Sequence, residues 1–122
     1  MPTTHDSRIY WMITCNVQPG QLTDFKQIVE QLVAAAKSEP GTLAYEFSIN
    51  ADQSAINIFE SYQDSSAVLS HVSQTFAPFA ERFLALARIS QFVIYGNPNN
   101  EVKKAFADFN PTYMTQFDGF TR

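Results

Sequence analysis

Hydrophobic and polar residues alternate along this chain with two different periods, and the changes of period divide it into six elements. A period of two, typical of β-strands, runs through residues 8–17, 42–50, 55–62 and 89–95. Apolar residues spaced by three and four indicate an amphipathic helix over residues 22–37. The second helical element is predicted as two shorter segments, one over residues 64–73 and one beginning near residue 77. The predicted order is strand, helix, strand, strand, helix, strand.

Turn-forming residues support these boundaries. Gln18-Pro19-Gly20 follows the first strand, and Glu39-Pro40-Gly41 follows the first helix. Proline removes a backbone hydrogen-bond donor and glycine accepts a positive φ, so both tripeptides predict tight turns. Asp64 is the predicted N-cap of the second helix, and Thr23 or Asp24 is the predicted N-cap of the first.

This order of elements, with short connections, is that of a ferredoxin-like βαββαβ plait. It is an α+β fold in which both helices lie on one face of a four-stranded antiparallel sheet, and we expect it to occupy residues 8–96. The strand positions expected on the other face include large apolar side chains, namely Tyr10, Met12, Phe59, Phe92 and Ile94. Each large side chain removed from water contributes roughly 1.5–3 kcal/mol, so a homodimer that covers this face is predicted.

Residues 97–122 form a C-terminal extension beyond the plait, and they are too hydrophobic for a typical disordered segment. Val102, Ala105, Phe106 and Phe109 have the spacing of one or two helical turns. We expect the extension to dock on the body of the domain or on the partner subunit.

Composition narrows the range of functions. The 122 residues carry a net charge of −4 and are 45% hydrophobic, which suits one globular domain with a modest core. The eight Lys and Arg residues are scattered, so neither nucleic acid nor a membrane surface is an expected partner. Cys15 is the single cysteine, and no Cys or His spacing predicts a metal site. Residues 9–17 are too short to cross a bilayer, and a reducing cytoplasm is the expected location.

Three sequence motifs together resemble the antibiotic biosynthesis monooxygenase family. They are Val-Gln-Pro-Gly beginning at Val17, Ser-Glu-Pro-Gly-Thr-Leu-Ala-Tyr-Glu beginning at Ser38, and Phe-Glu-Ser-Tyr-Gln-Asp-Ser-Ser-Ala-Val-Leu-Ser-His ending at His71. The combination is specific, although each motif alone would be weak. The resemblance implies a dimeric α+β barrel with a pocket in each subunit between the helices and the sheet.

The same resemblance implies a choice among several activities. Members of the family include cofactor-independent monooxygenases that use O₂ to oxygenate small quinol-like or polyphenolic substrates, which is the preferred hypothesis here. Relatives that degrade haem carry a proximal His and a first-strand Asn, but the matching positions are Glu81 and Ile13, so no cofactor is expected. The alternatives are an isomerase or lyase that acts on a small carbonyl compound by proton transfer, and a non-catalytic domain that binds a small molecule.

Four polar residues are candidates for the chemistry. His71 borders the apolar stripe of its helix, and histidine suits proton transfer near neutral pH, although a helix-edge His is often only hydrogen-bonded. Glu60 is in phase with inward-facing strand residues, where burial would raise its pKa, but it could equally pair with an arginine. Tyr45 could donate a hydrogen bond to a substrate oxygen or serve only as a core aromatic. Asn16 could stabilise an oxyanion.

Aromatic residues are candidates for substrate binding. Trp11 could stack on a flat ring, but it alternates with Asn16, so at most one of the two should line a given pocket. The other candidates are Phe59, Phe76, Phe79 and Phe83. Phenylalanines in such positions usually form core, although a pocket for an aromatic substrate has the same kind of wall.

Overall fold

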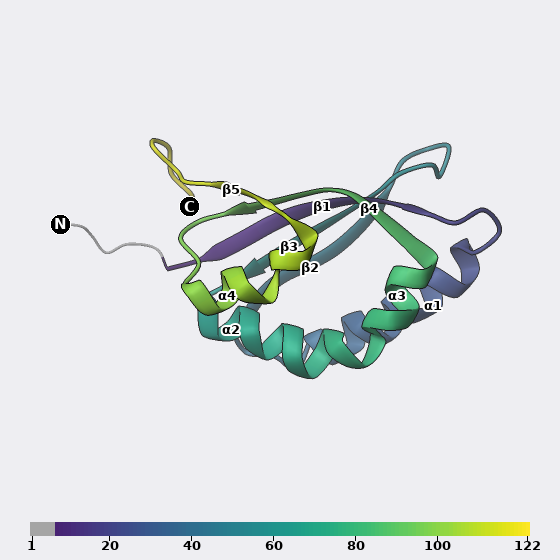
Figure 1. Ribbon diagram of the computed structural model, residues 1–122, viewed down its shortest axis with the longest axis horizontal. Helices are drawn as coiled ribbons and strands as arrows, with labels where there is room; N and C mark the ends of the chain where they lie inside the picture. Colours follow the sequence, from purple (N-terminus) through teal and green to yellow (C-terminus); the bar gives the residue numbers. More distant parts are fainter. Residues whose placement is uncertain (1–6) are drawn as a thin grey trace.

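In the computed structural model, which describes residues 7–122, strands form one twisted sheet and helices cover one of its faces (Figure 1). The strands are β1 (Ile9–Val17), β2 (Thr42–Ile49), β3 (Ile56–Tyr62), β4 (Ala87–Tyr95) and β5 (Thr112–Met114). They lie in the order β2-β3-β1-β4-β5, and the first four pair antiparallel. The predicted element order and the α+β ferredoxin-like class are confirmed.

The helices are α1 (Leu22–Ala36), α2 (Ser65–Ser70), α3 (Ala80–Leu86) and α4 (Asn100–Ala105). A π-helical segment (His71–Phe76) and a 3₁₀ turn (Ala77–Phe79) join α2 to α3, so the two predicted helical pieces form one continuous stretch. The Asp64 carboxyl accepts a hydrogen bond from the Ala67 N–H and caps α2 as predicted. The predicted cap of α1 is wrong, because the helix follows the Gly20 turn directly and has Gln21 at its N-cap position.

Strand pairing decides which side chains face the helices. Trp11 lies opposite Glu60 on β3 and opposite Ile94 on β4, and all three point to the helical side. Phe92 and Ile94 are 6% and 0% exposed, so placing them on the bare face was wrong. Residues 92–95 are apolar in both phases, and only pairing with β1 reveals that Val93 and Tyr95 are the outward-facing pair.

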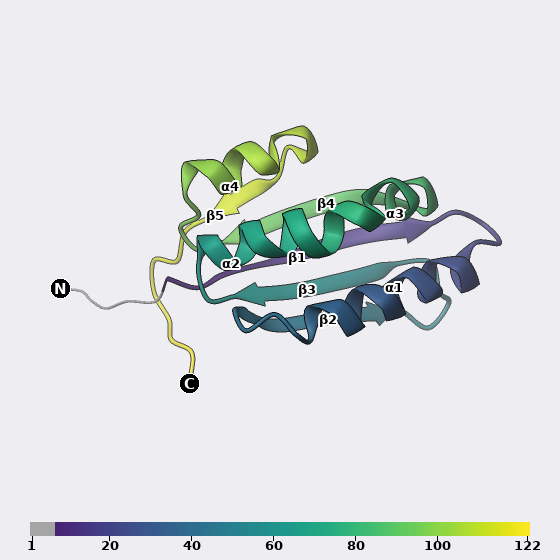
Figure 2. The same cartoon turned by 90° about the horizontal axis from the view of Figure 1, so that it is seen from below.

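The C-terminal extension packs on the body of the domain (Figure 2). Chain segment 97–114 leaves β4, forms α4 beside α2 and returns as β5, which pairs parallel to β4. Val102 of α4 is fully buried, and the Asn99 backbone N–H donates a hydrogen bond to the Ser65 hydroxyl. A 3₁₀ turn (Ala107–Phe109) lies between α4 and β5.

No helix within residues 7–122 has the length and apolar character needed to cross a membrane.

Candidate active site

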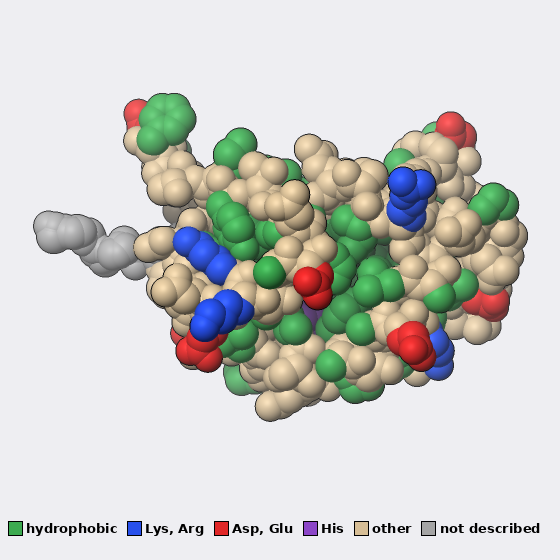
Figure 3. Space-filling model, in the orientation of Figure 1, with side chains coloured by type: hydrophobic (Ala, Val, Ile, Leu, Met, Phe, Trp, Pro, Cys, Tyr) green, Lys and Arg blue, Asp and Glu red, His purple; other side chains and the backbone are tan. Residues whose placement is uncertain are grey.

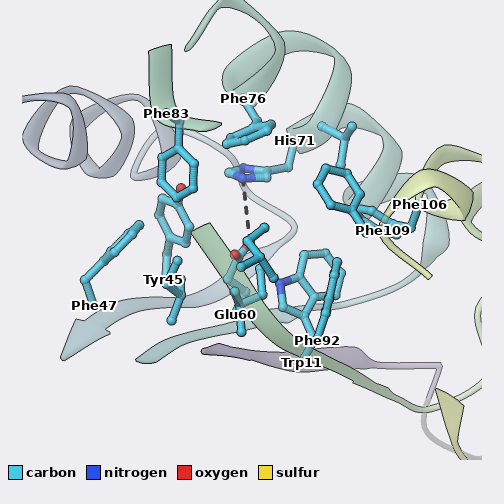
Figure 4. Close-up of a pocket in the computed structure, with 14 residues that line it drawn as sticks. Trp11, Tyr45, Phe47, Glu60, His71, Phe76, Phe83, Phe92, Phe106 and Phe109 are labelled. Atoms are coloured by element: carbon cyan, nitrogen blue, oxygen red, sulfur yellow. Dashed lines mark ion pairs between the residues drawn. The ribbon is translucent and has the colours of Figure 1, made fainter. Parts of the chain in front are cut away.

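A small cavity lies between the helical face of the sheet and the helices above it (Figure 4). Its wall is mainly aromatic, with Trp11, Tyr45, Phe47, Phe76, Phe83, Phe92, Phe106 and Phe109. The ionisable groups among the lining residues, apart from the Tyr45 phenol, are His71 and Glu60. A space-filling view shows a histidine surface at the bottom of a hollow lined by hydrophobic side chains (Figure 3). The arrangement can hold an apolar molecule against a few polar groups.

Glu39 fixes the orientation of the His71 ring. His71 is 3% exposed and is the first residue of the π-helical segment, and its Nδ1 lies 2.9 Å from Glu39 Oε1. Glu39 also accepts hydrogen bonds from the hydroxyls of Thr42 and Thr75. Burial alone would raise the pKa of Glu39, but the hydrogen bonds from Thr75, Thr42 and His71 outweigh it and lower the pKa. An ionised Glu39 can only accept a hydrogen bond, so His71 Nδ1 must carry the hydrogen. In the neutral imidazole this leaves the Nε2 lone pair free.

Glu60 lies on the other side of His71. Its Oε1 is 3.7 Å from His71 Nε2, and the Tyr62 hydroxyl donates to the same oxygen at 2.6 Å. Burial raises the pKa of Glu60, although the nearby His71 and Tyr62 partly offset the effect. These partners replace the arginine that the sequence left open as an alternative. A raised pKa favours the protonated carboxyl group, which can donate a hydrogen bond.

Two tyrosines surround the His71 ring. The Tyr45 and Tyr62 ring centroids lie 5.0 Å and 5.3 Å from the His71 ring centroid. Burial and the neighbouring Glu60 raise the pKa of both phenols. Both phenols therefore stay protonated and can act as hydrogen-bond donors but not as bases.

The cavity brings together six of the residues singled out from the sequence: Trp11, Tyr45, Glu60, His71, Phe76 and Phe83. Asn16 must be corrected, because it is exposed on the outer face and its amide donates to the Ser54 carbonyl. Phe59 also faces outward, where its ring centroid lies 6.4 Å from that of Tyr10. Phe79 packs against the edge of the core under the Arg82 guanidinium, outside the cavity.

Sequence reasoning missed several residues of the site. Glu39 was interpreted only as part of a turn, although an acid inside a turn motif is a signal worth testing. Tyr62 and Phe47 were interpreted as strand residues, and Phe92 was assigned to the wrong face. Phe106 and Phe109 come from the extension, whose hydrophobicity was the available signal.

The sequence pattern of the family described as antibiotic biosynthesis monooxygenase matches residues 8–82. Among solved structures, MupZ from Pseudomonas fluorescens superimposes with a TM-score of 0.86 at 21% identity, covering 100% of this chain and 94% of MupZ. SnoaB from Streptomyces nogalater, described as a cofactor-independent oxygenase, gives 0.64 at 14% identity and covers 77% of this chain and 96% of its own. A conserved protein from Methanosarcina mazei gives 0.65 at 16% identity, with 74% and 92% covered. No curated protein sequence matches the chain.

Proposed function

Because the chain belongs to the antibiotic biosynthesis monooxygenase family, we propose that it is a cofactor-independent monooxygenase of a small aromatic, quinol-like or polyphenolic substrate. Family membership and the oxygenase among the structural neighbours support monooxygenase chemistry in general. The main support for an aromatic substrate is the position of His71. Glu39 binds its Nδ1, which leaves Nε2 available as a base beside a cavity with aromatic walls. Such walls suit a flat apolar substrate.

His71 acts as the general base in this proposal. Its Nε2 takes a proton from the substrate, and the resulting imidazolium is stabilised by the Glu39 carboxylate 2.9 Å from Nδ1. Glu39 also lines a polar surface groove together with Thr42, Thr75 and residues of α2. The groove gives the transferred proton a route from the enclosed cavity to solvent.

The substrate supplies the electrons. Deprotonation makes it electron-rich, O₂ accepts electrons from it, and a carbon–oxygen bond forms to give a hydroperoxide. The ring carbon that bears the hydroperoxide still carries its hydrogen, and loss of water converts it into a quinone carbonyl, so one oxygen atom enters the product and the other leaves as water. Apolar walls exclude solvent from the intermediates. Tyr45, with its neutral phenol, donates a hydrogen bond to the substrate oxygen.

The cavity must widen to admit such a substrate. Its volume is about 50 Å³, whereas ligand sites usually measure roughly 300–1,000 Å³. Phe76 and Phe109 are only half-buried, and they are the lining aromatic residues placed on the irregular helical segments. Movement of these two rings opens the space between His71 and the extension.

Oxygen uptake tests the proposal. The wild-type protein, incubated in air with a panel of quinols and polyphenols, should consume O₂ faster than autoxidation. His71→Gln should lower kcat by about 10²–10⁴-fold, the usual contribution of a general base. Asn16→Ala, on the outer face, is the control and should keep wild-type activity. Uptake that never exceeds autoxidation, or that is equal in His71→Gln, contradicts the proposal.

A proton-transfer isomerase or lyase is the second candidate, favoured by one specific observation. The Glu60 carboxyl group, whose pKa burial raises, lies 3.7 Å from His71 Nε2 in one apolar cavity. Such a pair moves a proton within a carbonyl substrate without any oxidant. Turnover of a small enolisable ketone under nitrogen, measured by exchange of its α-hydrogens with deuterium from solvent, would favour this candidate over the oxygenase.

We also propose that the protein is a cytoplasmic homodimer. Tyr10, Met12, Phe59, Val93 and Tyr95 form a half-buried apolar patch on the outer face of the sheet, in which the Tyr10 and Tyr95 rings stack at 5.0 Å. The C-terminal end rises on the same side of the sheet (Figure 1), with Phe117 99% exposed. A second copy would cover both. The buried Cys15 thiol, whose pKa burial raises to about 11, suits a reducing location.

A further inference from the structure

Trp11 is held rigidly at the floor of the cavity. It is 2% exposed, and its ring centroid lies 4.9 Å from Tyr62, 5.2 Å from Phe106 and 5.8 Å from Phe92. Rings from β3, β4 and the extension therefore fix the plane of the indole. A side chain held in this way can present its one polar group in a single direction.

That polar group forms no hydrogen bond of good geometry with residues 7–122. Among the described residues, no atom accepts a hydrogen bond of good geometry from the buried Trp11 Nε1–H. Buried indole N–H groups usually find an acceptor, and an unpaired buried donor costs about 1–3 kcal/mol. A buried donor of this kind beside a cavity can donate a hydrogen bond to an acceptor atom of a ligand.

The Glu60 carboxyl group is a second possible donor beside the Trp11 N–H. It lies directly opposite Trp11 in the β1–β3 register, and the indole nitrogen turns toward it (Figure 4). A weak hydrogen bond from the Trp11 N–H to Glu60, short of good geometry, helps to lower the pKa of Glu60, although burial raises that pKa more. The Tyr62 hydroxyl donates to Oε1, which leaves Oε2 as the carboxyl oxygen that is available to carry a proton.

We propose that Trp11 Nε1–H and the Glu60 carboxyl form a two-donor site for one oxygen atom of the ligand. The ligand class is an apolar ring compound with a single carbonyl or phenolic oxygen at the end that meets β1 and β3. Trp11 thus acts by hydrogen bonding, not by stacking its ring on the substrate. This assignment rests on the proposed function, because it uses the same cavity and identifies the oxygen that becomes negative when His71 takes a proton.

Two compounds that differ by one oxygen test the site without turnover. Acetophenone carries a carbonyl group, and ethylbenzene is its hydrocarbon counterpart. Trp11 is the one tryptophan in the chain, so a ¹H–¹⁵N spectrum contains a single indole signal. Saturating acetophenone should move the indole proton downfield, while ethylbenzene should leave it nearly in place. This measurement on the wild-type protein does not depend on any variant folding.

Affinity measured by calorimetry provides the second readout. Trp11→Phe keeps an aromatic ring and removes the donor, so acetophenone should bind about tenfold more weakly, a loss of ~1.4 kcal/mol. The affinity for ethylbenzene should change less than about threefold, or ~0.7 kcal/mol. Both compounds could bind while the indole signal does not respond to the carbonyl group and Trp11→Phe still prefers the ketone. That result would refute the two-donor site but leave the proposed pocket intact. If neither compound binds, the pocket and the proposed function fail together.

Discussion

The proposed chemistry centres on three neighbouring ionisable residues. Glu39, His71 and Glu60 are linked by distances of 2.9 Å and 3.7 Å across the imidazole. The pKa values of the two acids are shifted in opposite directions. Glu39 accepts several hydrogen bonds, which lower its pKa, whereas burial of Glu60 raises its pKa. In the proposed mechanism Glu39, as a carboxylate, orients the base and Glu60, as a carboxylic acid, faces the ligand, so environment gives the same residue type two roles.

Glu60→Gln should stabilise the fold progressively as pH rises. The folded pKa of Glu60 lies above its unfolded value, so the folded state keeps a proton that the unfolded chain has already released, and wild-type stability falls through that window. Glutamine has nothing to ionise. Urea unfolding at a series of pH values upward from the unfolded pKa of Glu60 should show the advantage of Glu60→Gln growing until the folded pKa is passed. The variant leaves the groups that face Glu60 unchanged, namely His71, Tyr45, Tyr62 and Glu39. A difference in unfolding free energy that stays constant across the range would contradict the raised pKa.

Glu39→Gln should show the opposite dependence. The folded pKa of Glu39 lies below its unfolded value, so its stabilisation is present above the unfolded pKa and is lost as pH falls through the folded one. We expect a cost of about 1–3 kcal/mol near neutral pH from weakened hydrogen bonds, and the cost should shrink in acid. Unfolding curves near neutral pH and in acid measure it, and Glu46→Gln, an exposed acid on β2, is the control.

Two elements turn the common plait into a specific cavity. The π-helical segment places His71 at its start and Thr75 one turn later, and both side chains reach Glu39. π-helical turns often occur at functional sites. The extension supplies Phe106 and Phe109 as a wall on the far side of the cavity. The family match ends at residue 82, so this wall lies outside the shared sequence.

Phe109→Ala tests the extension as a substrate-binding element. Losing a ring that contacts a bound apolar substrate should raise KM by about 10–30-fold, since burial of such a side chain contributes roughly 1.5–3 kcal/mol when complete. The effect on kcat should be small because His71 and Glu39 are untouched. Phe79→Ala is the matched control: it removes a half-buried Phe outside the cavity and should leave KM unchanged. Equal KM changes in both variants would argue against a binding role.

The whole molecule has two unlike faces. The helical face of the sheet contains the core and the cavity, while the outer face has an apolar end and a polar end with Thr14 and Asn57 hydrogen-bonded across β1 and β3. The apolar end is where a second copy would gain most from burial. The proposed dimer therefore uses the end of the sheet near Tyr10 and Tyr95.

Phe59→Glu should separate the dimer. A charge within the apolar patch would be buried by association without a partner, which is costly, so Kd should rise by at least about 100-fold, or ~2.7 kcal/mol. Sedimentation velocity over a range of concentrations measures the change. Ser48→Glu adds the same charge at an exposed position of β2 outside the patch and should leave the dimer intact. A wild-type protein that sediments as a monomer at all concentrations would refute the proposal.

The sequence by itself determined the order of elements, the α+β class and the family. Strand and helix periods are local properties, and motifs such as Glu39-Pro40-Gly41 are contiguous, so both are readable without a fold. The first strand also revealed which side chains alternate, and therefore that Trp11 and Asn16 could not share a pocket. Local chemistry was enough for the Asp64 cap.

Tertiary structure decided everything that depends on residues far apart in the chain. Glu39, Glu60 and His71 meet only because the α1–β2 turn, the β1–β3 register and the π-helical segment converge. Which β4 side chains point toward the helices depended on pairing with β1, because both sets of alternating β4 residues are apolar. Neither the buried Trp11 donor beside Glu60 nor the wall from the extension has a local signature, since each is a relation between segments.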